Sequence, residues 1–227
     1  MSITNPVHIA IVMDGNRRWA KGNNFPIFWG HRRGIHTVSE IIRATIEKKI
    51  PYLTLFAFST ENWQRSTNEV GYLMGLFARS MVRYAVFLQK NEICVRFIGD
   101  LVPLREDLRA KIALIREKTD RNTKLFLTIA INYGSRDELV RAIKKIPIDE
   151  RQNCSWESIR GRLDTGDTPD VDLFIRTSGE QRLSNFLLLQ SAYAELFFIE
   201  KYWPEFTRQD FEAVLDTYRL RKRNFGK

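Results

Sequence analysis

The sequence predicts an α/β protein in which a mostly parallel central sheet is flanked by helices. Five short segments are strongly apolar and do not alternate between apolar and polar residues, which is typical of strands buried on both faces. Segments with helical periodicity lie between them, and no repeat, linker or low-complexity tract interrupts the order. Because strand and helix alternate throughout, we expect a doubly wound sheet in a single domain that spans residues 1–227.

The expected strands are, in chain order, His8–Met13, Tyr52–Phe58, Cys94–Ile98, Lys124–Ile131 and Val171–Ile175. Apolar stripes at helical spacing predict helices between them, at Ile35, Val38, Ile42 and Ile46, at Leu108, Ile112 and Ile115, and at Leu139, Ala142, Ile143 and Ile146. Three helix starts have the spacing of a capping box, at Ser66, Ser135 and Thr207. Residues 148–169 are polar and poorly patterned, so we expect a loop with a short helix near Ser155.

One predicted helix, from Ser66 to about Asn91, is apolar on two sides. Its main stripe is Val70, Leu73, Met74, Phe77, Met81, Tyr84 and Leu88. At ~100° per residue, a second set lies on roughly the opposite side, namely Tyr72, Leu76, Val82 and Val86. The second side is covered either by another subunit or by an apolar cleft for a ligand, and both interpretations stay open at this point.

The chain is basic, with 36 Lys and Arg against 27 Asp and Glu and a net charge of +9. Nucleic acid, an anionic membrane surface and phosphorylated small molecules all fit such an excess. The aromatic residues follow apolar periodicities and are not interleaved with Lys and Arg, which argues against nucleic acid. No apolar segment approaches the ~18 residues of a membrane span, and residues 1–6 are too short and polar for a signal peptide. We therefore expect a cytoplasmic protein with its two cysteines reduced.

Polar residues follow four of the predicted strands. In open parallel sheets the ligand lies beyond the carboxyl ends of the strands, so these segments are expected to share one site. The segments are Asp14–Trp19, Ser59–Arg65, Asn132–Ser135 and Arg176–Ser184. Together they bring carboxylates, amides, hydroxyls and arginines to one edge of the sheet, which indicates a site for an anion.

The first of these segments reads Asp14-Gly-Asn-Arg-Arg-Trp19 and combines a metal ligand with a diphosphate cradle. Gly15 permits a tight turn, and the free amides of a helix start bind anions, to which Arg17 and Arg18 add charge. A carboxylate beside an anion is favourable when a cation lies between them, and Mg²⁺ takes one or two carboxylates with phosphate oxygens and water. The alternative is that Asp14 only caps the helix. The three other polar strand ends favour the site.

Arg176, Arg182 and Ser184 are expected to form a second anion pocket, because two guanidinium groups and a hydroxyl suit a bidentate grip on phosphate. Surface ion pairs with Glu180 or Glu195 are the alternative for these arginines. The glycine-rich nucleotide cradles, the G-x-S-x-G elbow and the zinc motifs are all absent from the sequence.

Five blocks of the sequence resemble the cis-prenyltransferases, the undecaprenyl diphosphate synthase family. They are HIAIVMDGNRRWA, GHRRG, LTLFAFSTENWQR, VDLFIRTSGEQRLSNFLL, and AYAELFF followed by WPEF, and they span nearly the whole chain in family order. The resemblance implies Mg²⁺-dependent condensation of isopentenyl diphosphate with an allylic prenyl diphosphate, for which farnesyl diphosphate is the expected primer. It further implies a hydrophobic tunnel beside the long helix and a homodimer. The implied product is a long polyprenyl diphosphate such as undecaprenyl diphosphate, a precursor of the cell wall lipid carrier. Through this lipid product the resemblance also implies peripheral contact of the protein with the inner face of the membrane.

The same resemblance assigns roles residue by residue. Asp14 would carry Mg²⁺ and engage the allylic diphosphate, and Glu195 would be the second protein ligand of the metal. The first diphosphate would be held by Gly15, Asn16, Arg17, Arg18, Trp19, His31 and Arg65. Between the subsites would lie Ser59, Thr60, Glu61, Asn62 and Trp63, of which Asn62, with Ser59 and Asn16 nearby, would relay the proton lost in condensation. Isopentenyl diphosphate would be held by Arg176, Arg182, Leu183 and Ser184.

Four positions depart from the family pattern. Ile27 stands where an arginine is common, Ser66 replaces a common proline, Leu189 replaces a common tryptophan, and Asn224-Phe-Gly226 replaces Arg-x-Gly. The two missing arginines would weaken phosphate binding, and the cations placed to compensate are Arg17, Arg221 and Arg223.

Three alternatives remain beside this interpretation. A catalytically weak or silent partner subunit of the same fold usually lacks the aspartate or the Asn62 block, and this chain has both. A phosphohydrolase with Asp14 as nucleophile would need a second acid two residues later, where this chain has Asn16. A basic nucleic-acid-binding domain would show a steep salt dependence of oligonucleotide binding.

Overall fold

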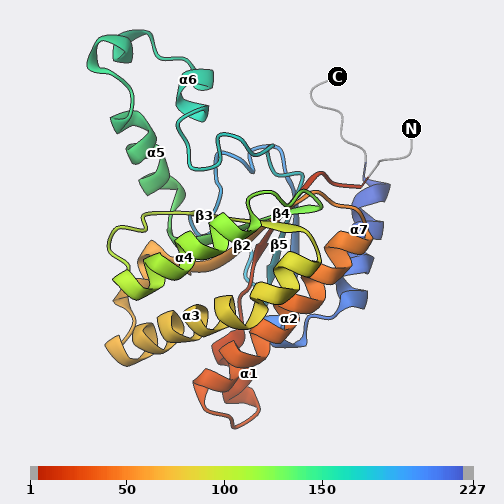
Figure 1. The fold of residues 1–227 in the computed structure, drawn as a ribbon. Helices are drawn as coiled ribbons and strands as arrows, with labels where there is room; N and C mark the ends of the chain where they lie inside the picture. The colour runs from red at the N-terminus through yellow and green to blue at the C-terminus, as the bar shows by residue number, and fades with distance from the viewer. Residues whose placement is uncertain (1–4, 222–227) are drawn as a thin grey trace.

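The computed structural model describes residues 5–221 and contains a six-stranded sheet whose strands are all parallel (Figure 1). The strands are β1 (His8–Val12), β2 (Tyr52–Ser59), β3 (Ile93–Ile98), β4 (Leu125–Tyr133), β5 (Leu173–Thr177) and β6 (Glu195–Ile199), in the spatial order β3-β4-β2-β1-β5-β6. The five predicted strands are confirmed, with ends that differ by one or two residues. The sixth, β6, was not predicted; it begins with a carboxylate, and its place at the edge of the sheet is defined by its pairing with β5.

Seven α-helices lie within the described residues, together with three short 3₁₀ segments. The α-helices are α1 (Asn16–Gly22), α2 (Ile27–Glu47), α3 (Thr67–Lys90), α4 (Glu106–Thr119), α5 (Ser135–Lys144), α6 (Trp156–Arg160) and α7 (Arg208–Leu220). The 3₁₀ segments are η1 (Thr60–Gln64), η2 (Ile148–Asn153) and η3 (Trp203–Glu205).

The predicted helix caps are confirmed at two of the three positions. Thr207 forms a complete capping box with Asp210, and the Ser66 hydroxyl accepts a hydrogen bond from the Glu69 amide. Ser135 does not cap its helix, because Gly134 occupies the capping position and the Ser135 hydroxyl accepts from the Leu188 amide at 2.7 Å. This hydroxyl instead ties the start of α5 to the segment that follows β5.

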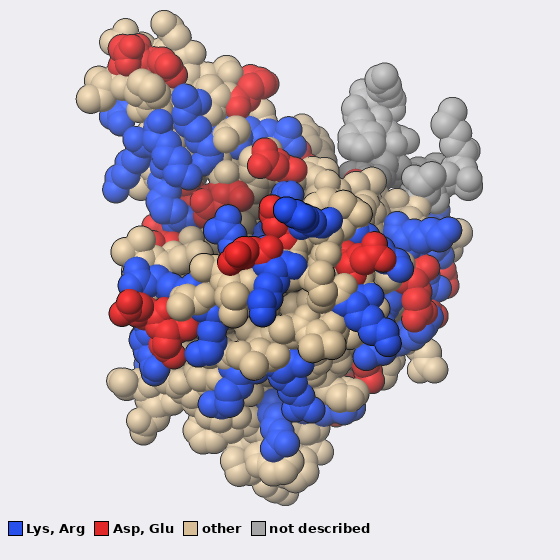
Figure 2. Space-filling view, viewed as in Figure 1, with Lys and Arg blue, Asp and Glu red and all other residues tan. Residues whose placement is uncertain are grey.

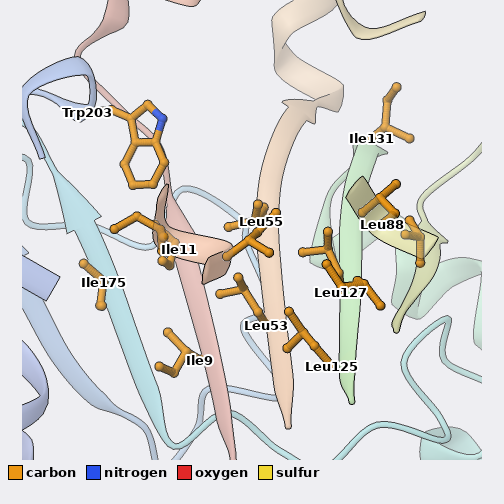
Figure 3. Close-up of a cluster of buried hydrophobic side chains, with 14 of the residues drawn as sticks. Ile9, Ile11, Leu53, Leu55, Leu88, Leu125, Leu127, Ile131, Ile175 and Trp203 are labelled. Atoms are coloured by element: carbon orange, nitrogen blue, oxygen red, sulfur yellow. The ribbon is translucent and has the colours of Figure 1, made fainter. Parts of the chain in front are cut away.

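The main hydrophobic core lies between one face of the sheet and helices α2, α3, α4 and α7. Figure 3 shows its central layer, in which the labelled side chains come from β1, β2, β4 and β5 and meet Leu88 and Trp203. On the other face, Phe186 and Leu187 pack on Ala10, Val12 and Phe174. The second face is therefore covered near β1 and β5 by the irregular segment after β5.

The two apolar sides of α3 have different surroundings. Residues of the main stripe, including Leu73, Phe77 and Leu88, line a large cavity, as does Leu76 from the second set. Val82 and Val86 are 64% and 77% exposed. Of the two interpretations of the second side, the cleft therefore applies to Leu76 and not to Val82 and Val86, for which cover by another subunit stays a prediction.

A hairpin made of α5, η2 and α6 projects from the body of the protein, at the top left of Figure 1. We call it the α5–α6 arm. It contains the loop and short helix predicted for residues 148–169, and the Ser155 hydroxyl caps α6 by accepting from the Ser158 amide at 3.3 Å. Cys94 is buried, Cys154 is exposed on the arm, and both are free thiols.

Within residues 5–221 no helix combines the length and the apolar character that crossing a bilayer requires.

Candidate active site

A cavity of about 950 Å³ opens at the carboxyl ends of β1, β2 and β5 and continues between the sheet and α3. Its opening is polar, whereas its interior is apolar and reaches Val95 of β3, Ile115 of α4 and Leu127 of β4. One cavity thus joins a charged mouth to an apolar tunnel. This is the tunnel beside the long helix that the family resemblance implied.

Asp14 lies two residues after the end of β1, at the polar end of this cavity. Gly15 follows it with a φ of 96°, and a Cβ at this position would lie 2.7 Å from the Tyr202 ring, so only glycine fits the turn. The Gly15 amide donates to Asp14 Oδ1 at 2.7 Å, and α1 has no side-chain cap. Asp14 therefore does not serve as the N-cap, which removes the alternative role considered for it.

Arg176 joins the end of β5 to Asp14. Its Nη2 donates to Asp14 Oδ2 at 2.8 Å, and its Nη1 donates to Ser184 Oγ at 2.6 Å. Burial opposes ionisation of Asp14, but the hydrogen bonds from Arg176 and the Gly15 amide outweigh it and hold the pKa of this carboxyl below its usual value. The Arg176 Nε is buried and has no partner in the structure. The centre of the site is thus an ionised carboxylate beside a buried cation with a spare donor.

A second group of cations lies on the wall formed by α1, α2 and α3. Arg17 and Arg65 both pair with Glu69, at 3.4 and 3.0 Å. Burial, reinforced by the positive charge of Arg65, lowers the pKa of His31 to about 4, and the His31 Nε2 is buried without a partner. Near pH 7 the imidazole is therefore neutral and can offer a hydrogen bond but no charge.

The segment after β2 is held in place by its own side chains. Ser59 and Asn62 form a capping box, in which Asn62 Oδ1 accepts from the Ser59 amide at 3.2 Å, and both residues line the cavity. Trp63 lies outside it, because its Nε1 donates to Asn132 Oδ1 at 2.7 Å. Glu61 accepts a hydrogen bond from the Asn185 amide group at 3.0 Å.

The structure brings most of the predicted site residues together in this cavity. Those that line it are Asp14, Gly15, Asn16, Arg17, Arg18, His31, Ser59, Glu61, Asn62, Arg65, Arg176 and Ser184. Those that do not are Trp19, Thr60, Trp63, Arg182, Leu183 and Glu195. The Trp19 Nε1 donates to Glu205 at 3.1 Å, and Thr60 and Trp63 line a second, shallow hollow. Leu183 packs against the apolar cluster around Phe174 and Phe186 on the other face of the sheet.

Arg182 and Glu195 differ most from the expected arrangement. The Arg182 side chain is 60% exposed and pairs with Glu180, the surface ion pair that was the alternative for it. Glu195 begins β6, in register with Leu173 at the start of β5, and it pairs with Arg221. Because the two strands are parallel, Glu195 lies at the end of the sheet opposite to Asp14. A single chain does not bring the two proposed metal ligands together.

Sequence reasoning missed several residues of the site, among them Glu69 and Asn185. Glu69 was interpreted only as part of a helix cap, although its position four residues after Arg65 at a helix start also predicts an ion pair. Asn185 lines the cavity, has a φ of 61° and donates to Glu61. Its place directly after Ser184 was the only signal for it.

The departures from the family pattern lie mostly away from the cavity. Ile27 begins α2 and does not line the cavity. Among the candidate compensating cations, Arg17 lines the cavity. Arg221 does not line it, because its guanidinium group stacks over the Phe197 ring and pairs with Glu195. Arg223 and Asn224–Gly226 lie outside the described residues.

The residues present fit a Mg²⁺ ion held through a single carboxylate. Within residues 5–221 no group of three or more His, Cys, Asp and Glu residues forms a complete protein site for a metal. Asp14 is ionised and reaches the cavity, and Mg²⁺ commonly keeps several waters and binds through one or two carboxylates plus substrate phosphates. Such an ion would therefore depend on the substrate for part of its shell.

Comparison with known proteins gives a consistent result. The family model described as "Putative undecaprenyl diphosphate synthase" matches residues 12–226. An isoprenyl transferase of Treponema denticola is 47% identical over 219 residues, which cover 96% of each chain, and one of Agrobacterium fabrum is 48% identical over 97% of this chain and 92% of its own length.

Two solved structures share the fold. Lavandulyl diphosphate synthase from Lavandula x intermedia, in complex with dimethylallyl diphosphate, has a TM-score of 0.94 at 33% identity and covers 99% of each chain. A probable undecaprenyl diphosphate synthase from Campylobacter jejuni has a TM-score of 0.85 at 37% identity, covering 99% of this chain and all of its own. The chain therefore belongs to the undecaprenyl diphosphate synthase family of prenyltransferases.

Proposed function

We propose that the protein condenses isopentenyl diphosphate with an allylic prenyl diphosphate, repeatedly and in cis geometry, to give a long polyprenyl diphosphate. The observation that carries this proposal is the single cavity that joins Asp14 and its surrounding arginines to an apolar tunnel. A diphosphate fits the charged mouth, and a growing hydrocarbon tail fits the interior. Burial of that tail is favourable by about 0.8 kcal/mol per CH₂ group.

The allylic diphosphate is assigned to the wall that carries Arg17, Arg18, His31 and Arg65. These groups line the cavity, and a neutral His31 can donate to a phosphate oxygen. Helix α1 has only seven residues, so the arginines contribute more to anion binding here than the helix dipole does.

Isopentenyl diphosphate is assigned to Arg176 and Ser184. The buried guanidinium group already holds the Ser184 hydroxyl and keeps an unpartnered Nε. Because Arg176 also contacts Asp14, the two diphosphates would lie on either side of that carboxylate. This arrangement would fix the isopentenyl double bond next to the allylic carbon.

The reaction breaks the allylic carbon–oxygen bond, and the electron pair leaves with the diphosphate. The isopentenyl double bond attacks that carbon, a new carbon–carbon bond forms, and a proton is lost from the isopentenyl unit. The arginines stabilise the charge that gathers on the departing diphosphate. Asn62, Ser59 and Asn16 also line the cavity and are assigned to relay the proton.

Magnesium is part of this proposal. Asp14 would hold the ion, which, when bound, neutralises charge on the leaving diphosphate. Asp14 itself stays ionised without the metal, because Arg176 and the Gly15 amide hold its charge.

The preferred primer is proposed to be farnesyl diphosphate, and the product a long chain such as undecaprenyl diphosphate, a lipid carrier precursor. A cavity of about 950 Å³ supports a long chain. The likeness to a synthase solved with dimethylallyl diphosphate raises that shorter allylic diphosphate as a second candidate primer. The proposed homodimer would use the α5–α6 arm, and the lipid product would bring the protein to a membrane surface.

The test is incubation with labelled isopentenyl diphosphate, Mg²⁺ and either farnesyl or dimethylallyl diphosphate, followed by sizing of the lipid. We expect long labelled chains from farnesyl diphosphate and none from the Asp14→Ala variant, with an unchanged circular dichroism spectrum. Saturable binding of both diphosphates without any product would instead identify a silent partner subunit. Full activity of Asp14→Ala would overturn the assignment of the site.

A further inference from the structure

The connection between α1 and α2 exposes aromatic side chains. Phe25, Phe28 and Trp29 are 46%, 41% and 54% exposed. Phe25 stacks on Trp29 with ring centroids 6.0 Å apart, and Phe28 packs on Tyr72 of α3 with centroids 4.2 Å apart. We call these four residues the aromatic tip. Soluble proteins rarely expose several neighbouring aromatic rings, and a contiguous apolar patch of this kind marks an interaction site.

Cations surround the aromatic tip, and carboxylates are absent from its segments. Neither residues 15–39 nor residues 70–91 contain an Asp or Glu. Within the part of the chain that the structure describes, six exposed cations of these segments form no ion pair, namely Lys21, Arg32, Arg33, Arg79, Arg83 and Lys90. In Figure 2 the lower end of the molecule, where Figure 1 places α1, is tan with Lys and Arg side chains above it.

Two of these cations are held at the rings themselves. The Arg32 guanidinium lies 5.6 Å from the centre of the Trp29 ring, and that of Arg79 lies 6.0 Å from the centre of the Tyr72 ring. Cation–π contacts keep the positive charge at the edge of the apolar surface. Apolar and positive groups therefore form one surface.

We propose that the aromatic tip docks on an anionic lipid bilayer. The rings of Trp and other aromatic residues lie preferentially in the headgroup region of a bilayer. Anionic lipids in that region attract nearby Lys and Arg side chains. The tip protrudes, whereas recognition of a peptide helix or strand needs a groove or a free sheet edge. Three of its four rings come from a Phe-Pro-Ile-Phe-Trp run that offers no side-chain acceptor for base recognition. An anionic bilayer is the partner that matches the shape, the apolar rings and the charge together.

This docking extends the membrane contact of the proposed function and rests on that function for its purpose. The two helices on either side of the connection, α1 and α2, carry Arg17, Lys21 and His31 of the cavity wall. The mouth of the cavity would thus lie beside the bilayer into which a long apolar product has to pass. Vesicle binding itself needs no substrate, so it can be measured apart from condensation.

The test is co-sedimentation of the full chain with vesicles of phosphatidylcholine alone or mixed with phosphatidylglycerol. We expect binding to the mixed vesicles only. Phe25→Ser with Trp29→Ser, and separately Arg32→Glu with Arg33→Glu, should each reduce that binding by about tenfold or more. Condensation in vesicle-free solution should be unchanged in these variants, because none of the four residues lines the cavity.

Matched controls make the same changes elsewhere on the surface. Val102→Ser with Leu114→Ser removes two side chains that are 76% and 47% exposed, and Arg109→Glu with Arg116→Glu reverses two exposed charges of α4. Both controls should bind vesicles like the unmodified chain. Equal losses in tip and control variants, or equal binding to both vesicle types, would overturn the proposal. So would tip variants that bind normally but form smaller oligomers, which would identify the tip as a contact between copies.

Discussion

Arg176 and Arg182 stand six residues apart after the same strand, and the sequence does not distinguish them. In the folded chain Arg176 is 4% exposed and contacts both Asp14 and Ser184. Arg182 projects into solvent and pairs with Glu180, and an exposed pair of this kind contributes little to stability or binding. The difference follows from the backbone, because Arg176 is still part of β5 whereas Arg182 lies beyond it.

This difference predicts unequal effects of the same substitution. Arg176→Lys keeps a positive charge but loses the two-pronged contact with Asp14 and Ser184, so we expect the KM for isopentenyl diphosphate to rise by about tenfold or more. Arg182→Lys is the matched control and should change this KM by less than about threefold. Steady-state kinetics at saturating allylic diphosphate measure both values, and equal effects would show that Arg182 turns inward when substrate binds.

His8 gives a stability prediction that is independent of catalysis. Its ring is fully buried between the Pro169 carbonyl and the Thr54 hydroxyl, and burial lowers its pKa to about 4 from a reference of 6.5. Between these two pH values the unfolded chain binds the proton and the folded chain does not, so folding becomes less favourable as pH falls from 6.5 towards 4. His8 should therefore account for a loss of about 2 kcal/mol in unfolding free energy between pH 7.5 and 5.

Urea unfolding of the unmodified chain and of His8→Gln at these two pH values tests this contribution. His31, whose pKa is also lowered to about 4, adds to the acid loss in both proteins and cancels in the comparison. The variant should lose about 2 kcal/mol less than the unmodified chain. Equal losses would mean that His8 does not resist protonation in the folded state.

At the scale of secondary structure, the elements with a strong local pattern could be predicted. Five strands were predicted from continuous apolar runs, and the cap at Thr207 follows from side chains that contact their own helix. The errors have a common cause, because β6 and the role of Ser135 depend on segments far away in the chain. Ser135 accepts a bond from Leu188, and the five residues of β6 are defined by pairing with β5.

The two sides of α3 illustrate the same limit. Periodicity shows that the helix is apolar on two sides but not which neighbour covers each side. In the structure the cavity takes the space between α3 and the sheet, and the outer Val82 and Val86 remain exposed. Ala57 of β2 lines the cavity opposite this helix, and its small side chain leaves the tunnel open.

Ala57→Leu should shorten the product. The added carbons occupy space in the tunnel that a growing tail would use, so chains should end at least one isoprene unit earlier, while turnover of the first condensation changes little. Chromatography of the labelled lipids after complete reaction measures this length. Val86→Leu, an enlargement on the exposed side of α3, is the control and should leave the length unchanged. The same product from both variants would show that the tail does not pass Ala57.

At the scale of the whole molecule, the location of the site could be predicted and its inner contacts could not. Parallel strands end at one edge of a sheet, so the polar segments after β1, β2 and β5 had to meet. The separation of Glu195 from Asp14 depends on the register of β6, and the contact of Glu69 with Arg17 depends on the approach of α1 to α3. Neither register nor helix approach is encoded in a local pattern.

The projection of the α5–α6 arm from the body of the protein is the other feature of the whole molecule that local patterns did not predict. It extends beyond the sheet, and on α5 the side chains of Val140 and Ile143 are 49% and 40% exposed. These residues are three apart and therefore lie on the same side of the helix. An apolar side on a projecting hairpin is suited to pack against its own copy, because a two-fold axis brings the same surface of each chain together.

Val140→Asp with Ile143→Asp should therefore convert a dimer into a monomer. Two carboxylates in an apolar contact would face their copies across the two-fold axis, and burying unpaired charges costs several kcal/mol. Sedimentation velocity over a range of concentrations distinguishes the two states. Val102→Asp, which places a charge at a side chain 76% exposed in the turn after β3, is the matched control and should remain dimeric. If the double variant stays a dimer while circular dichroism shows an intact fold, the arm is not the contact and another apolar surface must join the two copies.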